Sequence, residues 1–317
     1  MNSPTTRVTA DLPALLAEVA HAYQLGTLTH WRVLTTGYED CNIAGETSTG
    51  GSVVVKIFGP TRPSGLAART AILITAARRR GVRHPRLHHT RSGRHEHYLL
   101  GHQVLVMDLV AGATLYDRNR APSTTELTSV VDAAARIHSL DLHPDPVTDP
   151  WAITNLHHLA AELIDILDDE QHQHVTAALV HLDAVDRRAL PHRLVHGDLT
   201  KGNILIEPDG QVIVLDFAVA TRAPRIQELA VVAANLTHGH PDPLPQRAAR
   251  IAELYSRTAV PALDDRELAA LPGFTRAAAA MEMLGALAEW RDGNRNTETE
   301  FLIQLGLNGL RDYSVLN

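Results

Sequence analysis

The spacing of apolar residues divides the chain into a sheet-rich first part and a larger helical part. Short strand-like runs separated by turn residues predict strands at 31–34, 43–47, 52–58 and 104–110. Helical spacing in the same part predicts helices at 10–24 and 66–80. Beyond residue 110, helical spacing dominates, at 124–140, 153–167, 172–188, 226–236, 247–256, 266–271, 276–290 and 298–310.

One predicted hairpin interrupts the helical part. Strands at 203–207 and 211–215 flank Pro208-Asp209-Gly210, where Pro fixes φ and Asp-Gly allows a sharp reversal. Asp198 and Asn203 precede the first strand and Asp216 follows the second, so we expect the three side chains to meet beside one cleft. Two carboxylates and an amide carbonyl are hard oxygen ligands that suit Mg²⁺ and an incoming hydroxyl. A surface hairpin with turn-capping Asp and Asn residues is the simpler alternative, but it does not explain the complete spacing.

Composition is that of a soluble globular protein. The 317 residues are 44% apolar, long enough for two sizeable cores, and no apolar run approaches the ~18 residues of a membrane span. The first residues lack the basic and apolar segments of a signal peptide. A single cysteine, Cys41, cannot form an internal disulfide, which fits a reducing compartment. We therefore expect a cytoplasmic protein without a membrane partner.

Charge is distributed unevenly around the net value of −7. Residues 1–108 hold 12 Lys+Arg and 7 Asp+Glu, whereas residues 109–317 hold 17 and 29. This distribution favours an anion near the first part and a cation near the second, although solvated surface charge explains it equally well. Only Lys56 and Lys201 are lysines among 29 basic residues, which hints at sites that require a compact point charge.

Three features of the sheet-rich part are candidate nucleotide contacts. Lys56 ends the apolar run at 53–55, on the third strand. A Gly-containing turn between the first two strands, with Gly37, Asp40 and Asn42, is placed to cover phosphates, although ordinary hairpin chemistry explains it equally well. The strand at 104–110 leads into a hinge, where we expect the backbone amides of Met107, Asp108 and Leu109 to meet an adenine edge.

Two further residue classes are read as surface features. Residues 59–95 contain nine Arg and no Asp or Glu; a solvated helix explains them better than an acidic partner, and nucleic acid is disfavoured because the chain is acidic overall. The pairs His95/His97, His172/His174 and His238/His240 lack Cys partners, so solvated histidines are the better interpretation than zinc ligands.

A family resemblance rests on five segments of the sequence. The carrying residues are G-Y-E-D-C-N at 37–42, K-I-F at 56–58, H-G-D-L-T-K-G-N at 196–203, L-D-F at 215–217 and A-P-R-I-Q-E-L-A at 223–230. The chain resembles the aminoglycoside phosphotransferase and choline kinase superfamily, and within it the homoserine kinase and hydroxylysine kinase branch. The resemblance implies an α+β, bilobal protein-kinase-like fold, with a small antiparallel-sheet N-lobe at 1–108 and a mostly helical C-lobe at 109–317.

The resemblance also implies roles for the motif residues, with ATP and Mg²⁺ as cofactors. Asp198 orients and deprotonates the acceptor hydroxyl, and Asn203 and Asp216 hold Mg²⁺. Lys56 steadies the α- and β-phosphates. Lys201 touches the γ-phosphate, and His196 shapes the catalytic loop, residues 196–203, through a hydrogen bond. Substrate-lining residues are expected in the acidic lobe, namely Glu228, Asn235, Arg276 and Glu282.

One departure from the family pattern concerns Lys56. Related kinases pair this lysine with a Glu on the following helix, and here that helix has no acid. Lys56 must therefore pair elsewhere, for example with Glu39 or Asp40, or rely on the nucleotide. The leading hypothesis is a kinase of a hydroxyl on an amine-bearing small molecule, such as an amino alcohol, an amino acid or an aminoglycoside-like antibiotic. The alternatives are a kinase of Ser/Thr in a peptide with an acidic leader and a non-catalytic nucleotide-binding protein.

Overall fold

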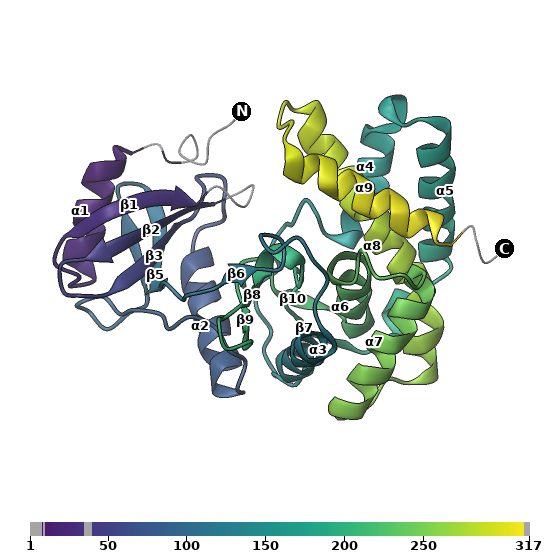
Figure 1. Ribbon diagram of the computed structural model, residues 1–317, viewed down its shortest axis with the longest axis horizontal. Helices are drawn as coiled ribbons and strands as arrows, with labels where there is room; N and C mark the ends of the chain where they lie inside the picture. The colour runs from purple at the N-terminus through teal and green to yellow at the C-terminus, as the bar shows by residue number, and fades with distance from the viewer. Residues whose placement is uncertain (1–7, 9, 35–39, 314–317) are drawn as a thin grey trace.

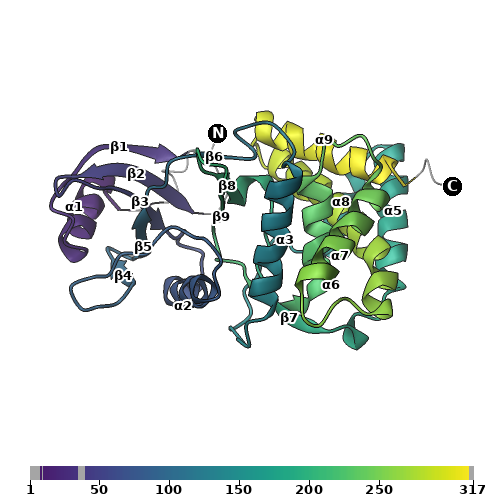
Figure 2. The same ribbon diagram turned by 60° about the horizontal axis from the view of Figure 1, so that its bottom comes forward.

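The chain folds into a small sheet region and a larger helical region that lie side by side (Figures 1 and 2). The structure, a computed structural model, describes residues 8, 10–34 and 40–313. The predicted α+β, bilobal kinase-like architecture is confirmed. The strand β5 ends at Asp108, where the sequence places the lobe boundary; the division of the chain into domains at this residue stays a prediction.

Five antiparallel strands form the N-terminal sheet, in the spatial order β1-β2-β3-β5-β4. Their bounds are β1 Leu28–Leu34, β2 Cys41–Thr47, β3 Ser52–Ile57, β4 Glu96–Leu99 and β5 His102–Asp108. Asn42 of β2 and Leu105 of β5 flank Lys56 in register. The sheet therefore carries Asn42 and Lys56 side by side near one edge of the helical region.

The two faces of this sheet have different partners because side chains alternate along a strand. Val53, Val55 and Ile57 of β3 pack with helix α1 (Leu12–Ala22), and the buried thiol of Cys41 lies in the same cluster. Leu105 and Met107 of β5 belong to a second cluster with helix α2 (Leu66–Arg79). Lys56 lies between the α1-facing residues 55 and 57 in sequence, so its side chain extends from the opposite face, toward the helical region.

The helical region is built from seven α-helices and short connecting turns within the described residues. These are α3 Thr124–His138, α4 Leu156–Glu162, α5 Asp169–Asp183, α6 Arg225–Val231, α7 Leu244–Thr258, α8 Asp265–Arg291 and α9 Thr297–Arg311. Capping boxes fix the starts of α3, α5 and α8, where Ser123, Asp168 and Asp264 accept from the backbone three residues later. A π-helical turn, η6 (Val232–Leu236), directly continues α6.

Two small sheets carry the functional loops between these helices. β8 (Ile204–Ile206) and β9 (Val212–Val214) form the predicted hairpin, and β6 (Ala113–Thr114) pairs with β8. Gly210 adopts φ +85° in the turn and donates its N–H to the carbonyl of Glu207 at 3.0 Å, which closes the hairpin. β7 (His192–Val195) pairs with β10 (Thr221–Pro224). The catalytic-loop sequence thus begins at the end of β7 and ends in the hairpin.

Several sequence-based boundaries were wrong. β4, β6, β7 and β10 were not predicted, because each has at most four residues and none of them was marked by a turn signal such as Pro208-Asp209-Gly210, which identified the equally short β8 and β9. The helix expected at 153–167 is broken into α4 between two 3-10 turns. Conversely, the helices expected at 266–271 and 276–290 are one continuous helix, α8, which contains Pro272. Its packing against α5, α6 and α9 outweighs the missing N–H of the proline.

One hydrophobic cluster joins both regions. It contains Leu66 and Ile74 of α2, Leu105 of the sheet, and Ile204 and Val214 of the hairpin. The base of the cleft between the regions is therefore packed rather than hinged on a bare linker. Among the helices that the structure describes, none is both long and apolar enough to cross a membrane.

Candidate active site

A cleft of about 660 Å³ lies between the sheet region and the helical region. Residues of both regions line it, including Asn42 and Lys56 from the sheet and Asp198, Asn203 and Asp216 from the catalytic loop and hairpin. The three side chains that the hairpin was expected to bring together are therefore in one cleft. This is the arrangement that the spacing of Asp198, Asn203 and Asp216 around the hairpin predicts.

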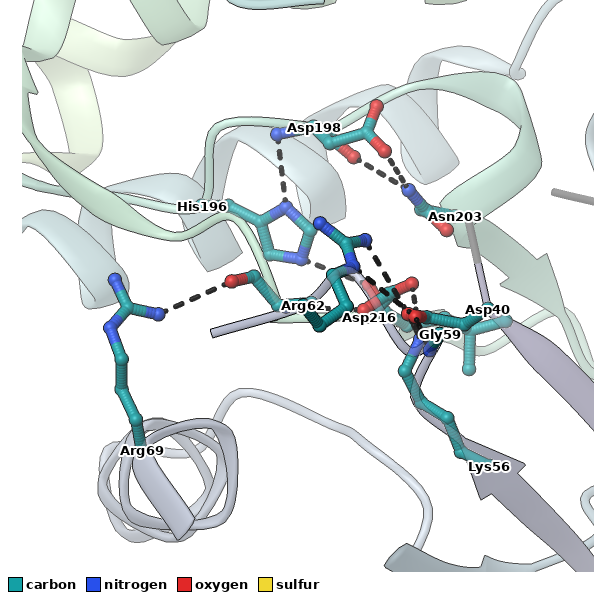
Figure 3. Close-up of polar contacts among 11 residues, drawn as sticks. Asp40, Lys56, Gly59, Arg62, Arg69, His196, Asp198, Asn203 and Asp216 are labelled. Atoms are coloured by element: carbon teal, nitrogen blue, oxygen red, sulfur yellow. Dashed lines mark hydrogen bonds and ion pairs between the residues drawn. The ribbon is translucent and has the colours of Figure 1, made fainter. Parts of the chain in front are cut away.

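Lys56 is buried between two carboxylates (Figure 3). Its Nζ lies 2.8 Å from Asp40 Oδ2 and 2.8 Å from Asp216 Oδ2. Arg62 Nε and the Gly59 N–H donate to the other oxygen of Asp40, at 3.2 and 3.1 Å. Asp40 thus provides the carboxylate partner for Lys56 that α2, which has no Asp or Glu, cannot provide.

This ion-pair group keeps its charges despite its burial. Burial alone would raise the pKa of Asp216, but the Lys56 ammonium outweighs it and lowers that pKa to about 2. Burial also works against the charged forms of Asp40 and Lys56. Lys56 and Arg62 nevertheless lower the pKa of Asp40, and the two carboxylates raise the pKa of Lys56. The cleft therefore holds a fixed ammonium between two fixed carboxylates.

The catalytic loop turns sharply to present Asp198 to the cleft. Gly197 allows the turn at φ +88°, a conformation that favours glycine. Asn203 Nδ2 donates to Asp198 Oδ2 at 2.6 Å, so the amide fixes the carboxylate and leaves its own carbonyl oxygen for another partner. Burial, with a contribution from the charge of Asp216, raises the pKa of Asp198. A carboxylate with a raised pKa is suited to accept a proton from a hydroxyl.

His196 is buried beneath this loop and forms two backbone hydrogen bonds. The Asp198 N–H donates to its Nδ1 at 3.3 Å, so Nε2 carries the ring proton and donates to the Leu215 carbonyl at 2.9 Å. The ring also contacts Phe217 edge-on, with centroids 4.6 Å apart. The His196 ring therefore connects Leu215, which precedes Asp216, to Asp198. This connection is the loop-shaping role expected of His196.

Glu228 does not line the cleft, and its assignment as a substrate contact was wrong. Its carboxylate is buried under the loop and accepts from the N–H groups of His196 at 2.9 Å and Gly197 at 2.7 Å. His138 Nε2 lies 3.1 Å from the same carboxylate, and its Nδ1 contacts the Tyr255 hydroxyl at 2.7 Å. Helix α6 therefore anchors the catalytic loop through Glu228. The sequence showed an acid at this spacing but not which way it faces.

Asn235 and Glu282 do line the cleft, on the side of the helical region. Asn235 belongs to the π-helical turn η6, a feature often found at functional sites. Its Oδ1 accepts from the Lys201 N–H at 2.8 Å, and its Nδ2 donates to Glu282 Oε1 at 2.8 Å. Burial raises the pKa of Glu282 to about 7, Asn235 opposes the shift, and the charge of Asp198 adds to it.

Lys201 also lines the cleft, but its ammonium has protein partners. Nζ donates to the His238 carbonyl at 3.2 Å and lies 5.6 Å from the centroid of the Phe301 ring. Burial, with the charge of Arg247, lowers the pKa of Lys201 to about 8. The bond to the His238 carbonyl uses one of the three N–H donors of the ammonium, and a contact of Lys201 with the γ-phosphate stays a prediction.

Two of the hinge amides named from the sequence already have backbone acceptors. The Asp108 N–H donates to the Arg86 carbonyl at 3.0 Å and the Leu109 N–H to the Ser52 carbonyl at 2.9 Å. Met107 pairs with Val54 in the ladder. These three residues line the cleft, as does Val110, but the expectation that their amides are open to a ligand was wrong for Asp108 and Leu109.

Two other expectations have different outcomes. Arg276 does not line the cleft; its guanidinium lies 4.3 Å from the Tyr313 ring centroid, on another face of α8. Gly37 lies outside the described residues. Sequence reasoning also missed Arg62 and Arg69, which contact the site, because it treated the arginine segment as solvated. It missed Trp151 and Phe301, which line the cleft, because isolated aromatic residues carry no motif.

Among the described residues, no group of three or more His, Cys, Asp and Glu side chains could hold a metal ion without further ligands. Asp216 and Asn203 provide one carboxylate and one amide oxygen in the same cleft. This small donor set fits Mg²⁺, which proteins commonly bind through one or two carboxylates together with substrate phosphates and water.

Comparison with known proteins identifies the family and the fold. A family profile described as the phosphotransferase enzyme family matches residues 30–291. The homoserine kinase of Nitrobacter winogradskyi is 25% identical, over 95% of this chain and 94% of that protein. Spectinomycin phosphotransferase in complex with ADP and spectinomycin has the same fold, with a TM-score of 0.66, 9% identity and 96% and 95% of the two chains covered. A choline/ethanolamine kinase family protein from Mesorhizobium loti gives a TM-score of 0.63 at 15% identity, over 96% and 93%.

Proposed function

Because the chain belongs to the phosphotransferase enzyme family and is a kinase, we propose that it transfers the γ-phosphate of ATP to a hydroxyl of an amine-bearing small molecule. One observation carries this proposal: a single cleft holds the Asp198–Asn203 pair, from the catalytic loop, and the pair that Lys56 of the sheet forms with Asp216 of the hairpin. A base for the hydroxyl and a charged site for phosphates therefore lie within reach of one another.

In the proposed nucleotide half, Lys56 binds the α- and β-phosphates while Asp40 and Arg62 hold it in place. Asp216 and the free carbonyl oxygen of Asn203 hold Mg²⁺, which neutralises phosphate charge when bound. For the adenine edge, the Asp108 carbonyl faces away from β3, because the N–H of the same residue bonds to Arg86 on the other side. We expect this alternation to continue past the end of β5, so that the Val110 N–H faces the same way. We assign the adenine contacts to these two groups rather than to the N–H groups of Asp108 and Leu109, which already have backbone acceptors.

In the proposed acceptor half, Asp198 orients the hydroxyl and takes its proton, and Asn203 sets the position of the accepting carboxylate. Beside Lys201, acidic and aromatic side chains line the rest of this half. Asp149, Glu282 and Glu298 line it together with Trp151 and Phe301. Carboxylates and aromatic faces attract a protonated amine. The relatives named for homoserine and for choline or ethanolamine support an amino alcohol or amino acid, and the one named for spectinomycin supports an antibiotic.

The two alternatives have less support. Four residues of the arginine segment pair with carboxylates of the protein, namely Arg62 with Asp40, Arg83 with Glu207, Arg86 with Asp108 and Arg94 with Glu96. These arginines are not available to an acidic peptide leader, which leaves it exposed arginines such as those at 78–80. The support for a non-catalytic protein is the missing glutamate of α2, and Asp40 supplies a carboxylate for Lys56 in its place.

The test is turnover with purified protein, Mg-ATP and a panel of amino alcohols, homoserine and aminoglycosides. We expect phosphorylation of at least one of them, and Asp198→Asn should lower kcat by about 10²–10⁴, the usual contribution of a general base. Asp209→Asn, in the exposed hairpin turn, is the matched control and should retain activity. Undiminished turnover by Asp198→Asn would refute the assigned role.

A further inference from the structure

Helix α2 reaches the active site with an arginine rather than with an acid. Residues 66–79 contain no Asp or Glu, and of the arginines at the helix C-terminus Arg78, Arg79 and Arg80 are exposed. Arg69 lies one turn from the helix start and is partly buried at the junction with the helical region (Figure 3). Among the arginines of helix α2, Arg69 therefore has a different environment from those at the C-terminal end.

The Arg69 guanidinium holds three backbone carbonyls on two segments of the helical region. Nη1 donates to the Ala218 carbonyl at 3.2 Å and Nη2 to the Ala220 carbonyl. Nε donates to the Asp145 carbonyl at 3.0 Å. Only a planar fork with several N–H donors makes all three contacts at once, so lysine cannot replace it.

The segment that Arg69 holds begins two residues after Asp216. Asp216 has φ +57°, a left-handed conformation that a non-glycine residue keeps only when its surroundings enforce it. On its N-terminal side, His196 donates to the Leu215 carbonyl. On its C-terminal side, the Ala218 N–H donates to Asp216 Oδ1 at 3.1 Å, and the carbonyl of the same residue accepts from Arg69. The strained residue is thus fixed from both directions.

We propose that Arg69 is a positioning residue for phosphate transfer: by holding the Ala218 and Ala220 carbonyls, it keeps the Asp216 carboxylate directed toward Lys56 and Asn203. The proposal rests on the proposed function in one respect, that Asp216 holds the metal of the nucleotide. Helix α2 then acts on the cleft through Arg69, whose guanidinium binds the segment after Asp216. The carboxylate partner of Lys56, which related kinases place on this helix, is here Asp40.

The test compares Arg69→Ala and Arg69→Lys with Arg79→Ala, a substitution at an exposed position of the same helix. The first measurement is hydrogen exchange of the peptide that contains the Ala218 and Ala220 amides, which bond to Asp216 Oδ1 and the Phe217 carbonyl. We expect exchange at least about tenfold faster in Arg69→Ala, an intermediate rate in Arg69→Lys, and no change in Arg79→Ala.

The second measurement is calorimetric binding of AMP-PNP with Mg²⁺ and, separately, with EDTA. Arg69→Ala should lose about tenfold in affinity with Mg²⁺ and retain its affinity in EDTA, because Lys56 and Asp40 remain in place. Added methylguanidinium should restore part of the Mg²⁺-dependent affinity, which a general loss of stability would not allow.

The outcomes separate this inference from the proposed function. Exchange at 218–220 that stays the same in Arg69→Ala would overturn the inference, as would an equal loss of affinity with and without Mg²⁺. If the unmodified protein binds no Mg-AMP-PNP, the proposed function fails, and the exchange measurement still decides whether Arg69 holds the segment. If Arg69→Ala does not fold, the same comparisons are made with Arg69→Lys.

Discussion

Glu282 shows how strongly burial can change one residue. The residue is 9% exposed, and its carboxyl has a single protein donor, Asn235, among the bonds found in the described part of the chain. Burial therefore raises its pKa from 4.5 to about 7, with help from the nearby charge of Asp198. A side chain with this pKa changes charge near neutral pH, and in the proposed function only the ionised form attracts a protonated amine.

Glu282→Gln is expected to remove a pH dependence of stability. The folded protein binds this proton more tightly than the unfolded chain, so the stabilisation is complete below about pH 4.5 and is lost as pH rises through 7. The size is about 3 kcal/mol for a shift of this magnitude. Denaturant unfolding from pH 5 to 8 should show the variant gaining stability relative to the parent as pH rises. Parallel curves would contradict the shifted pKa.

The individual site residues differ in how far the sequence predicted them. Asp198, Asn203 and Asp216 were found because their spacing around a hairpin is itself a geometric signal. Asp40 was one of two carboxylates suggested for Lys56, and the structure pairs them. Arg69 was not found, because an arginine bound to backbone carbonyls has no partner side chain in the sequence to mark it. Arg276 was misplaced because its helix, α8, is buried on several sides and the sequence does not say which face meets the cleft.

At the scale of the element, the catalytic loop depends on the helix that follows it. Helix α6 supplies Glu228, which binds two successive N–H groups of the loop, and the π-helical turn that continues it supplies Asn235, which binds a third. A π-turn widens the helix by one residue per turn, so it changes the direction of the side chains that follow. The apolar pattern of 226–236 predicted a helix but contained no sign of this change.

Glu228→Gln is expected to weaken both the fold and the activity. A glutamine has one accepting oxygen, so one of the two buried N–H groups would face an NH₂ group and remain unpaired. We expect unfolding free energy to fall by about 1–3 kcal/mol, the usual cost of such a group. In steady-state assays, kcat should fall at least about tenfold because Asp198 follows Gly197 directly.

Glu253→Gln, on the exposed face of α7, is the matched control for this change, with 69% of its side chain exposed. It should leave both stability and kcat unchanged. A Glu228→Gln variant as stable and active as this control would show that the loop holds its shape without the carboxylate.

At the scale of the whole molecule, the two regions share one core. Alternation in the strands and the helical spacing of 66–80 predicted that sheet and helix each have a buried face. They did not predict that α2 and the hairpin are in the same cluster, because apolar residues do not specify their partners. The bilobal arrangement came from the family resemblance instead. A shared core implies that the lobes do not unfold independently.

We therefore expect a single cooperative thermal transition by calorimetry and circular dichroism. Leu73→Ala, at a buried position of α2, should lower the stability of the whole protein by about 2–5 kcal/mol. Ile72→Ala, next to it and 61% exposed, should have little effect. Two separate transitions, with only the first shifted by Leu73→Ala, would show that the regions are independent.

The burial of the single cysteine has a practical consequence. Cys41 lies on β2 next to Asp40, with no exposed surface, and no other thiol is present in the sequence. A thiol-reactive reagent can modify the folded protein only while this strand is transiently detached from its neighbours. The rate of modification of Cys41 therefore measures how often β2, the strand beside Asp40, opens. Cys41 is thus a natural reporter of this opening, and no engineered label is needed.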